Sequence, residues 1–368
     1  MIKILYVISD TNIGGAGHQL LNLLRGLGKR NYAIKVVVPL DAMLIRHLDE
    51  IGIEYVEVPH IAEKSFSMRA IWHLYKIISA FKPDIVHTHA ALSARIAAKL
   101  YRRCKIINTR HCAFPLTRMQ KNLRWAVRIA EWFLGGLTIA VSASAKEKLV
   151  QQGVHEKKIV VVNNGINTSL YKYDESKRVE TRNELCLSED TFCVGHVGRI
   201  ESEKNHSFLL EVFDIIRKQR KSALVLVGSG SLEEEIKTQA EKLGIINDVS
   251  FLGTRSEVSK LYQCFDVFVM PSIAEGFGLA AVEAQCSGLG CVLSEHFPKA
   301  VKCSDSVKFL PLCDASLWAK EALSFPNQNR NDGSANVINS ELDIETMCNK
   351  MAEIYVSVAN ANTFRRKV

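Results

Sequence analysis

The chain has 368 residues, of which 47% are hydrophobic, and a formal net charge of +8. This length and apolar content suit two α/β domains of ordinary size, each with its own core. The ten cysteines form no Cys-x-x-Cys pair and no Cys/His cluster at zinc spacing, which excludes a zinc site of the usual sequence pattern. Because residues 1–9 lack the layout of a signal peptide, we expect a cytoplasmic chain with reduced thiols.

The first part of the chain alternates between short apolar runs and longer helical patterns. Strands are predicted at 2–9, 33–38, 53–58, 84–88, 104–109, 137–141 and 159–163. Helices are predicted at 17–30, 42–50, 67–81, 90–102, 120–134 and 143–152. This alternation predicts a parallel sheet wrapped by helices, in a domain of residues 1–165. The polar segment 164–190 is interpreted as the connection to the next domain.

A second alternating series follows. Its strands are predicted at 191–197, 223–227, 249–252, 266–270 and 290–294. Its helices are predicted at 205–219, 231–243, 256–263, 277–287 and 315–325, with a loop at 326–338 and a last helix at 340–360. The predicted fold class is α/β, with two doubly wound, Rossmann-like domains facing a cleft. The second domain covers 166–345, and 346–368 forms a C-terminal helix.

The positive charge is concentrated in the amino-terminal part. Residues 1–165 contain 24 Lys and Arg against 11 Asp and Glu, whereas the remainder contains 23 against 28. An anionic partner is therefore expected, either nucleic acid or an anionic membrane surface. The acidic second part and the absence of a known recognition motif argue against nucleic acid.

Two carboxylates, Glu275 and Glu283, stand eight residues apart where a predicted strand turns into a predicted helix. Gly276 and Gly278 lie between them and allow the backbone to approach a ligand closely. The free N–H groups at the start of the helix are suited to an anion. Carboxylates beside free amides fit a ligand with both hydroxyls and phosphates, such as a nucleotide sugar.

The run from Pro271 to Glu283 resembles the Glu-x7-Glu signature of retaining family-4 glycosyltransferases, which have the GT-B fold. The resemblance implies that Glu275 contacts sugar hydroxyls of the donor and that Glu283 contacts the nucleotide ribose. It places Phe277 and Leu279 in the donor-binding loop beside the two glycines. In GT-B proteins the last helix returns to the amino-terminal domain, and we expect 346–368 to do so here.

Two cations follow the first strand of the second domain. Arg199 ends that strand and Lys204 precedes a helix, a spacing that suits a clamp on two phosphates. Glu203-Lys204-Asn205 resembles the Glu-Lys-Asn of the same family, in which the Arg and Lys stabilise the leaving diphosphate. The resemblance also places Gly228 and Gly253, in two later strand-to-helix turns, around the base and ribose.

The amino-terminal domain carries three companion motifs. Gly14 and Gly15 resemble the loop that approaches the donor diphosphate, and His89 follows a strand in an Asp-hydrophobic-hydrophobic-His-x-His pattern. The resemblance places His89 on the acceptor side and His111 near the donor sugar. The sequence departs from the family pattern at Cys112, where many members have Gly, and at Asn167, which replaces Asp.

A basic and aromatic stretch at 117–133 is predicted to lie on anionic lipid. Its charged and aromatic residues are Arg118, Lys121, Arg124, Trp125, Arg128, Trp132 and Phe133. Its charges argue against a transmembrane span. An ordinary amphipathic surface helix explains the same pattern, and the sequence leaves this alternative open.

Together the motifs predict a retaining glycosyltransferase with a nucleotide diphosphate sugar donor, expected to be a UDP-sugar. Glu275, Arg199, Lys204 and His111 are the predicted catalytic residues. No Asp-x-Asp occurs, so we expect catalysis without a metal or other cofactor. The tail 288–299 resembles exopolysaccharide and capsule transferases, which implies a glycan acceptor, lipid-linked, at the inner face of the cell membrane. The alternatives are a non-catalytic nucleotide-sugar-binding protein and a GT-B UDP-sugar epimerase.

Overall fold

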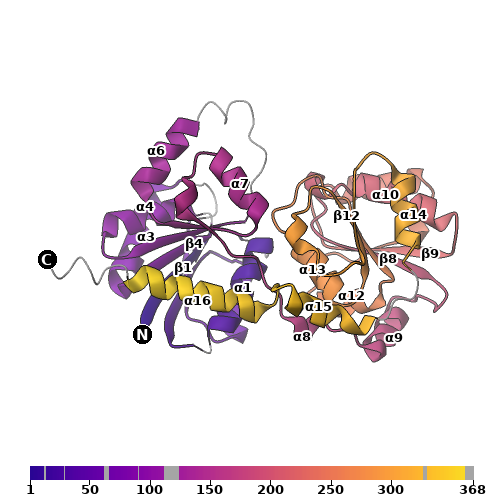
Figure 1. Cartoon of the computed structure of the whole chain (residues 1–368), viewed down its shortest axis with the longest axis horizontal. Coiled ribbons are helices and arrows are strands. Elements are labelled where there is room, and N and C mark those ends of the chain that lie inside the picture. The colour runs from indigo at the N-terminus through magenta and orange to yellow at the C-terminus, as the bar shows by residue number, and fades with distance from the viewer. Residues whose placement is uncertain are drawn as a thin grey trace. The chain divides into compact units, whose positions relative to one another are not determined.

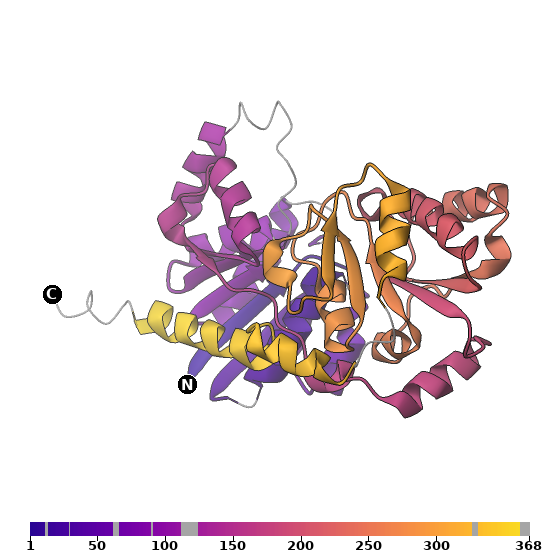
Figure 2. The same cartoon turned by 45° about the vertical axis from the view of Figure 1, so that its right-hand side comes forward.

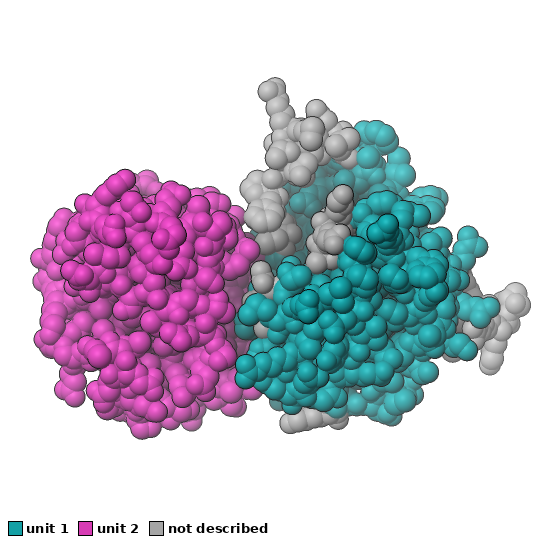
Figure 3. All heavy atoms as spheres, turned by 180° about the vertical axis from the view of Figure 1, so that it is seen from behind, with its two compact units in different colours: residues 1–165, 344–368 teal, residues 166–343 magenta. Residues whose placement is uncertain are grey.

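The computed structural model describes residues 1–11, 14–28, 30–61, 66–89, 91–111, 124–325 and 330–360. The chain forms two compact units, coloured separately in Figure 3. Unit 1 consists of Met1–Gly165 together with Ile344–Val368, and unit 2 consists of Ile166–Asp343. The chain therefore passes between the units twice, after Gly165 and after Asp343.

Unit 1 is built on a parallel sheet of seven strands in the order β3-β2-β1-β4-β5-β6-β7 (Figure 1). The strands are β1 (Ile2–Ile8), β2 (Tyr32–Pro39), β3 (Tyr55–Val58), β4 (Ile85–His89), β5 (Lys105–Arg110), β6 (Leu137–Ala140) and β7 (Ile159–Val161). The helices are α1 (Gly15–Leu27), α2 (Leu44–Glu50), α3 (Met68–Phe81), α4 (Leu92–Tyr101), α6 (Arg124–Leu134), α7 (Ala143–Gln151) and α16 (Ile344–Asn360). The apolar run from Ile4 to Ile8 in β1 follows from burial on both faces of the sheet, and all five residues of β4 are buried as well.

Unit 2 repeats this architecture with six parallel strands in the order β10-β9-β8-β11-β12-β13. The strands are β8 (Phe192–Val197), β9 (Ser222–Val227), β10 (Val249–Phe251), β11 (Val267–Met270), β12 (Gly290–Ser294) and β13 (Val307–Leu310). The helices are α8 (Thr168–Tyr171), α9 (Glu175–Glu184), α10 (His206–Arg217), α11 (Glu233–Lys242), α12 (Val258–Cys264), α13 (Leu279–Cys286), α14 (Ala315–Leu323) and α15 (Gly333–Asn339). In both units the order reverses beside the first strand, as in dinucleotide-binding sheets.

The last helix belongs to the core of unit 1. Figure 2 shows α16 running along the unit, and its buried side chains join the apolar cluster of β1 and α1. The hydroxyl of Tyr355 lies 2.7 Å from that of Tyr6 and 2.7 Å from Nδ1 of His87 in β4. Buried polar groups need such partners, so this network fixes where α16 docks. Residues 361–368 lie outside the described residues.

The prediction that 164–190 is a connection is wrong. This segment contains α8 and α9, which belong to unit 2. Helix α9 lacks a strong apolar pattern because charged contacts hold it in place. Arg178 and Arg182 both pair with Asp266, and the side chain of Asp174 caps the first turn.

The predicted loop at 326–338 is also wrong in its second part, which forms α15. A Cβ atom added to Gly333 would lie 2.4 Å from the backbone nitrogen of Gly288. The small residues that favour a loop in the sequence therefore permit close helix packing. Strand β13, with its short half-buried run, was not predicted.

Candidate active site

In each unit the predicted site residues follow strands on either side of the point where the strand order reverses. Gly14 follows β1 and His89 ends β4 in unit 1, while Arg199 follows β8 and Glu275 follows β11 in unit 2. The carboxyl ends of strands at such a point are where doubly wound sheets bind ligands. Topology therefore brings these residues, distant in sequence, to one edge of their own sheet.

Lys204 and Glu275 form an ion pair in unit 2. Nζ of Lys204 donates to Oε2 of Glu275 over 2.6 Å, and the two side chains are 13% and 12% exposed. The backbone N–H of Ile273 donates to the carbonyl of Glu203 over 2.8 Å and joins the two loops. An ammonium group has three N–H donors, so Lys204 retains donors for a ligand phosphate while Glu275 orients it.

Arg199 lies at the surface of the same unit. Its guanidinium donates to Glu203 over 2.6 Å, and its side chain is 63% exposed. An exposed pair of this kind contributes little stability, so a phosphate can replace Glu203 at low cost. The structure thus pairs the two predicted cations with different carboxylates.

The start of α13 lacks a side-chain cap. Its N-cap, Gly278, has φ of 94° and supplies no side-chain cap. A Cβ atom there would lie 2.4 Å from the ring of Phe297, so both the backbone conformation and the packing require glycine. Gly276 and Leu279 flank this cap, and Phe277 is buried beneath it. The first N–H groups of a helix favour an anion.

Glu283 is held by two tyrosines. The hydroxyl of Tyr262 donates to one carboxylate oxygen over 2.8 Å and that of Tyr171 to the other over 3.0 Å. Burial raises the pKa of Glu283, and the two hydrogen bonds oppose that change. The tyrosines lie 112 and 21 residues away in sequence, so no local pattern could have identified them.

Close backbone contacts shape the loops after β8 and β9. Gly228 has φ of 129°, and a Cβ atom on it would lie 2.0 Å from the carbonyl oxygen of Gly198. Its N–H donates to the carbonyl of Gly253 over 2.9 Å. The two predicted pocket glycines are therefore joined directly, and Gly228 is sterically required.

Gly14 and Gly15 form the start of α1. Among the described residues, a Cβ atom added to either would meet no heavy atom within 4 Å, and the N-cap of α1 makes no side-chain hydrogen bond. Packing against the part of the chain that the structure describes therefore does not require glycine at these positions. The open space and the uncapped helix fit a loop that admits an anionic ligand.

His89 and His111 are in direct contact. Nδ1 of His89 lies 2.8 Å from Nε2 of His111, and the rings stack with centroids 5.1 Å apart. His89 is 2% exposed, so it lies behind His111 and does not present a surface for an acceptor. Burial lowers the pKa of His111 to about 4, which keeps its imidazole neutral at physiological pH.

Part of the predicted membrane helix is described, as α6. Its exposed apolar side chains include Trp125, Ile129, Trp132 and Phe133, while Lys121 lies outside the described residues. In the described ranges no helix is both long and apolar enough to cross a membrane. Those same ranges contain no group of three or more His, Cys, Asp or Glu side chains arranged to hold a metal ion.

Comparison with known families defines the class of protein. Residues 13–170 match the family described as Glycosyltransferase Family 4, and residues 177–303 match Glycosyl transferases group 1. Unit 1 and unit 2 thus each carry a glycosyltransferase domain. The protein is a glycosyltransferase with the GT-B fold, as the sequence motifs predicted.

Individual relatives cover most of the chain. The EpsF protein of Bacillus subtilis (strain 168), classed as a glycosyltransferase, is 28% identical over 81% of this chain and 80% of its own length. The UDP-Gal:alpha-D-GlcNAc-diphosphoundecaprenol alpha-1,3-galactosyltransferase of Escherichia coli is 28% identical over 80% and 79%. The crystal structure of Anabaena Alr3699/HepE in complex with UDP and glucose has a TM-score of 0.81 at 22% identity, covering 97% of this chain and 100% of that chain.

Proposed function

We propose that this glycosyltransferase is a retaining enzyme of the family-4 type and takes its sugar from a UDP-sugar. The observation that carries the proposal is the Lys204–Glu275 ion pair at the reversal point of the unit 2 sheet. Support for the donor class comes from relatives, since one is named for UDP-Gal and the similar Anabaena structure holds UDP.

Each group in unit 2 has a distinct proposed role. Lys204 and Arg199 stabilise the negative charge that develops on the departing diphosphate, together with the amides at the start of α13. Glu275 holds sugar hydroxyls while it orients Lys204, and Glu283 accepts hydrogen bonds from the ribose. Because Glu275 already holds Lys204 in the folded unit, we infer that little reorganisation accompanies the charge change.

The residues of unit 1 take part in the same proposal. Gly14 and Gly15 leave room for the donor diphosphate, and neutral His111 is the proposed sugar-side group. We assign His89 a positioning role behind His111 in place of the acceptor contact implied by the resemblance, because its ring is buried against His111.

We further propose that the acceptor is a lipid-linked glycan in exopolysaccharide or capsule synthesis. The enzyme would then work at the inner face of the cell membrane, held by an anionic surface. The support is the name of the E. coli relative, which includes alpha-D-GlcNAc-diphosphoundecaprenol, and the exposed aromatic and basic residues of α6. Departure of the leaving group is proposed to need no metal, because Lys204 and Arg199 supply the positive charge.

The direct test is release of UDP from a panel of UDP-sugars, with a lipid-linked glycan present. One UDP-sugar should be turned over by the wild type and not by Glu275→Ala. Binding of a UDP-sugar without turnover would favour a binding protein, and conversion of the sugar without transfer would favour an epimerase.

A further inference from the structure

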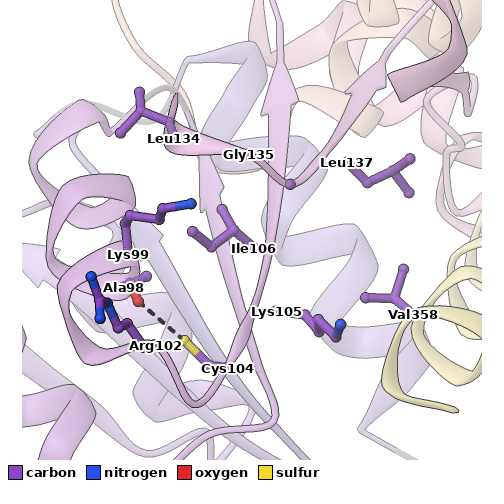
Figure 4. Close-up of a pocket in the computed structure, with 11 residues that line it drawn as sticks. Ala98, Lys99, Arg102, Cys104, Lys105, Ile106, Leu134, Gly135, Leu137 and Val358 are labelled. Atoms are coloured by element: carbon purple, nitrogen blue, oxygen red, sulfur yellow. Dashed lines mark hydrogen bonds between the residues drawn. The ribbon is translucent and has the colours of Figure 1, made fainter. Parts of the chain in front are cut away.

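A cavity of about 680 Å³ opens in unit 1 where β5 and β6 begin (Figure 4). Its walls come from the end of α4, the turn after α6, the starts of the two strands and Val358 of α16. His89 lies at the carboxyl end of its strand in this sheet, and Gly14 and His111 follow the carboxyl ends of theirs. The cavity is therefore at the opposite edge and is separate from the candidate active site.

Three cations line this cavity: Lys99, Arg102 and Lys105. Among the residues that the structure describes, no carboxylate lines it and none of the three cations pairs with one. Burial raises the pKa of the lining Cys104 thiol to about 12, so this group adds no negative charge. Three unopposed positive charges around one hollow favour an anionic ligand.

The sequence around the cavity is also rich in positive charge. Residues 91–135 contain ten Lys and Arg and a single acidic residue, Glu131. Both oxygens of Glu131 already accept hydrogen bonds from Arg95, at 2.8 and 2.6 Å. The one carboxylate in this segment is therefore paired with Arg95 and does not neutralise the cations of the cavity.

The rest of the cavity wall is apolar. Ile106, Leu134, Leu137 and Val358 line it, and Leu134 is the last residue of α6. Next to it Trp132 is 76% exposed and Phe133 is 61% exposed. Lys99 extends toward this side, with Nζ 5.7 Å from the centre of the Phe133 ring. A free inorganic anion would leave this apolar surface in water, whereas an amphipathic anion would cover it.

We propose that this cavity binds the phosphate headgroup of an anionic phospholipid, with the apolar part of the lipid against the α6 side of the cavity. The proposal rests on the membrane association proposed above and names its ligand and site. It is independent of the transfer reaction.

The test is calorimetric titration of the full chain with dihexanoyl phosphatidylglycerol below its micelle concentration. Inorganic phosphate and dihexanoyl phosphatidylcholine are titrated in parallel. The variants are Arg102→Gly and Lys105→Gln, and the matched control is Arg103→Ala. Arg103 is an exposed neighbour that does not line the cavity. Arg102 has φ of 63°, a backbone conformation that glycine adopts without strain, so Arg102→Gly removes the charge without opposing the fold.

We expect saturable binding of one phosphatidylglycerol per chain. Each cavity variant should weaken this binding about fivefold, the effect of one cation near an anionic lipid, while Arg103→Ala leaves it unchanged. Glu275→Ala should bind the lipid normally even if it has lost turnover, which separates this proposal from the proposed reaction. Equal binding by all variants, equal affinity for inorganic phosphate, or no binding of phosphatidylglycerol would each overturn the assignment.

Discussion

Lys204 and Glu275 depend on each other in a way that their positions in the sequence do not reveal. They are 71 residues apart, and their contact arises because β8 and β11 are neighbours in the sheet. Sequence motifs predicted that both residues are functional but placed Lys204 with Arg199. The structure instead pairs Lys204 with Glu275 and Arg199 with Glu203.

This pairing leads to a prediction for the two single variants and the double variant. Lys204→Ala and Glu275→Ala should each lower turnover at least about a hundredfold, since one lost electrostatic stabiliser costs about 3 kcal/mol in the transition state. The turnover of the double variant should be little lower than that of either single variant, because each single change already breaks the Lys204–Glu275 ion pair. The measurement is kcat for UDP release, with circular dichroism to verify folding. Near-normal turnover in both single variants would remove the site assignment.

Gly15 offers a test that separates stability from function. Gly15→Ala should raise the melting temperature, because alanine is favoured over glycine in a helix by up to about 1 kcal/mol and its Cβ meets nothing. The same methyl group should raise KM for the donor, since it projects into the space proposed for the diphosphate. The measurements are thermal unfolding and donor saturation kinetics. A stabilised variant with unchanged KM would show that this loop does not approach the donor.

At the scale of elements, the buried polar network of β4 and α16 predicts sensitivity to acid. Burial lowers the pKa of His87 to about 3, with Tyr355 and Thr109 as its partners. Below the ordinary histidine pKa of about 6.5, the unfolded chain binds a proton that folded His87 excludes. The contribution of neutral His87 to the free energy of unfolding should therefore be fully present near neutral pH. It should be lost as the pH drops from about 6.5 toward 3.

The variant His87→Phe provides the control for this prediction. It removes the titrating group, so the loss of unfolding free energy between pH 7 and pH 5 should be smaller than in the wild type. Its stability at pH 7 will also fall, because two hydroxyl groups lose their partner. Urea denaturation at several pH values measures the slope separately from this constant loss. An unchanged slope would exclude His87 as its source.

The prediction about membrane association concerns helix α6 and Lys121, which precedes it in the sequence. Wild-type protein should co-sediment with anionic vesicles at low salt and be released at high salt, since each surface cation contributes about 1 kcal/mol and salt screens it. The triple variant Lys121→Ala, Arg124→Ala and Arg128→Ala should bind more weakly. Neutral vesicles serve as the control. Equal binding by wild type and variant would mean that this helix is an ordinary surface helix.

The elements show where sequence interpretation succeeds and where it fails. Strands β1, β4, β8 and β11 were predicted within one or two residues because each begins or continues in apolar residues that are buried in the sheet. Helices α9 and α15 were missed because ion pairs and close glycine contacts hold them, and neither produces a periodic apolar pattern. The same limit applies to the site, where the tyrosines around Glu283 are joined to it by tertiary packing alone.

For the whole molecule, both units share a strand order and both match glycosyltransferase domains, so the fold and the class rest on independent observations. The sequence motifs were sufficient to predict both. They did not identify the partner of each site residue or the cavity where β5 and β6 begin in unit 1. Both depend on which side chains come into contact in the fold, and a sequence pattern does not contain that information.

We also predict that the whole enzyme works without a metal ion. Turnover should persist in EDTA, because Lys204, Arg199 and helix amides are proposed to stabilise the departing diphosphate. The measurement is UDP release with EDTA and after addition of manganese. Loss of activity in EDTA with recovery on manganese would contradict the proposal.

The most direct measurement of the central claim is the rate of UDP release from the preferred UDP-sugar, with and without a lipid-linked glycan acceptor. We predict that the acceptor strongly accelerates release in the wild type, that sugar appears on the acceptor, and that both effects disappear in Lys204→Ala. Release that is unaffected by any lipid-linked acceptor, or transfer that survives in Lys204→Ala, would contradict it.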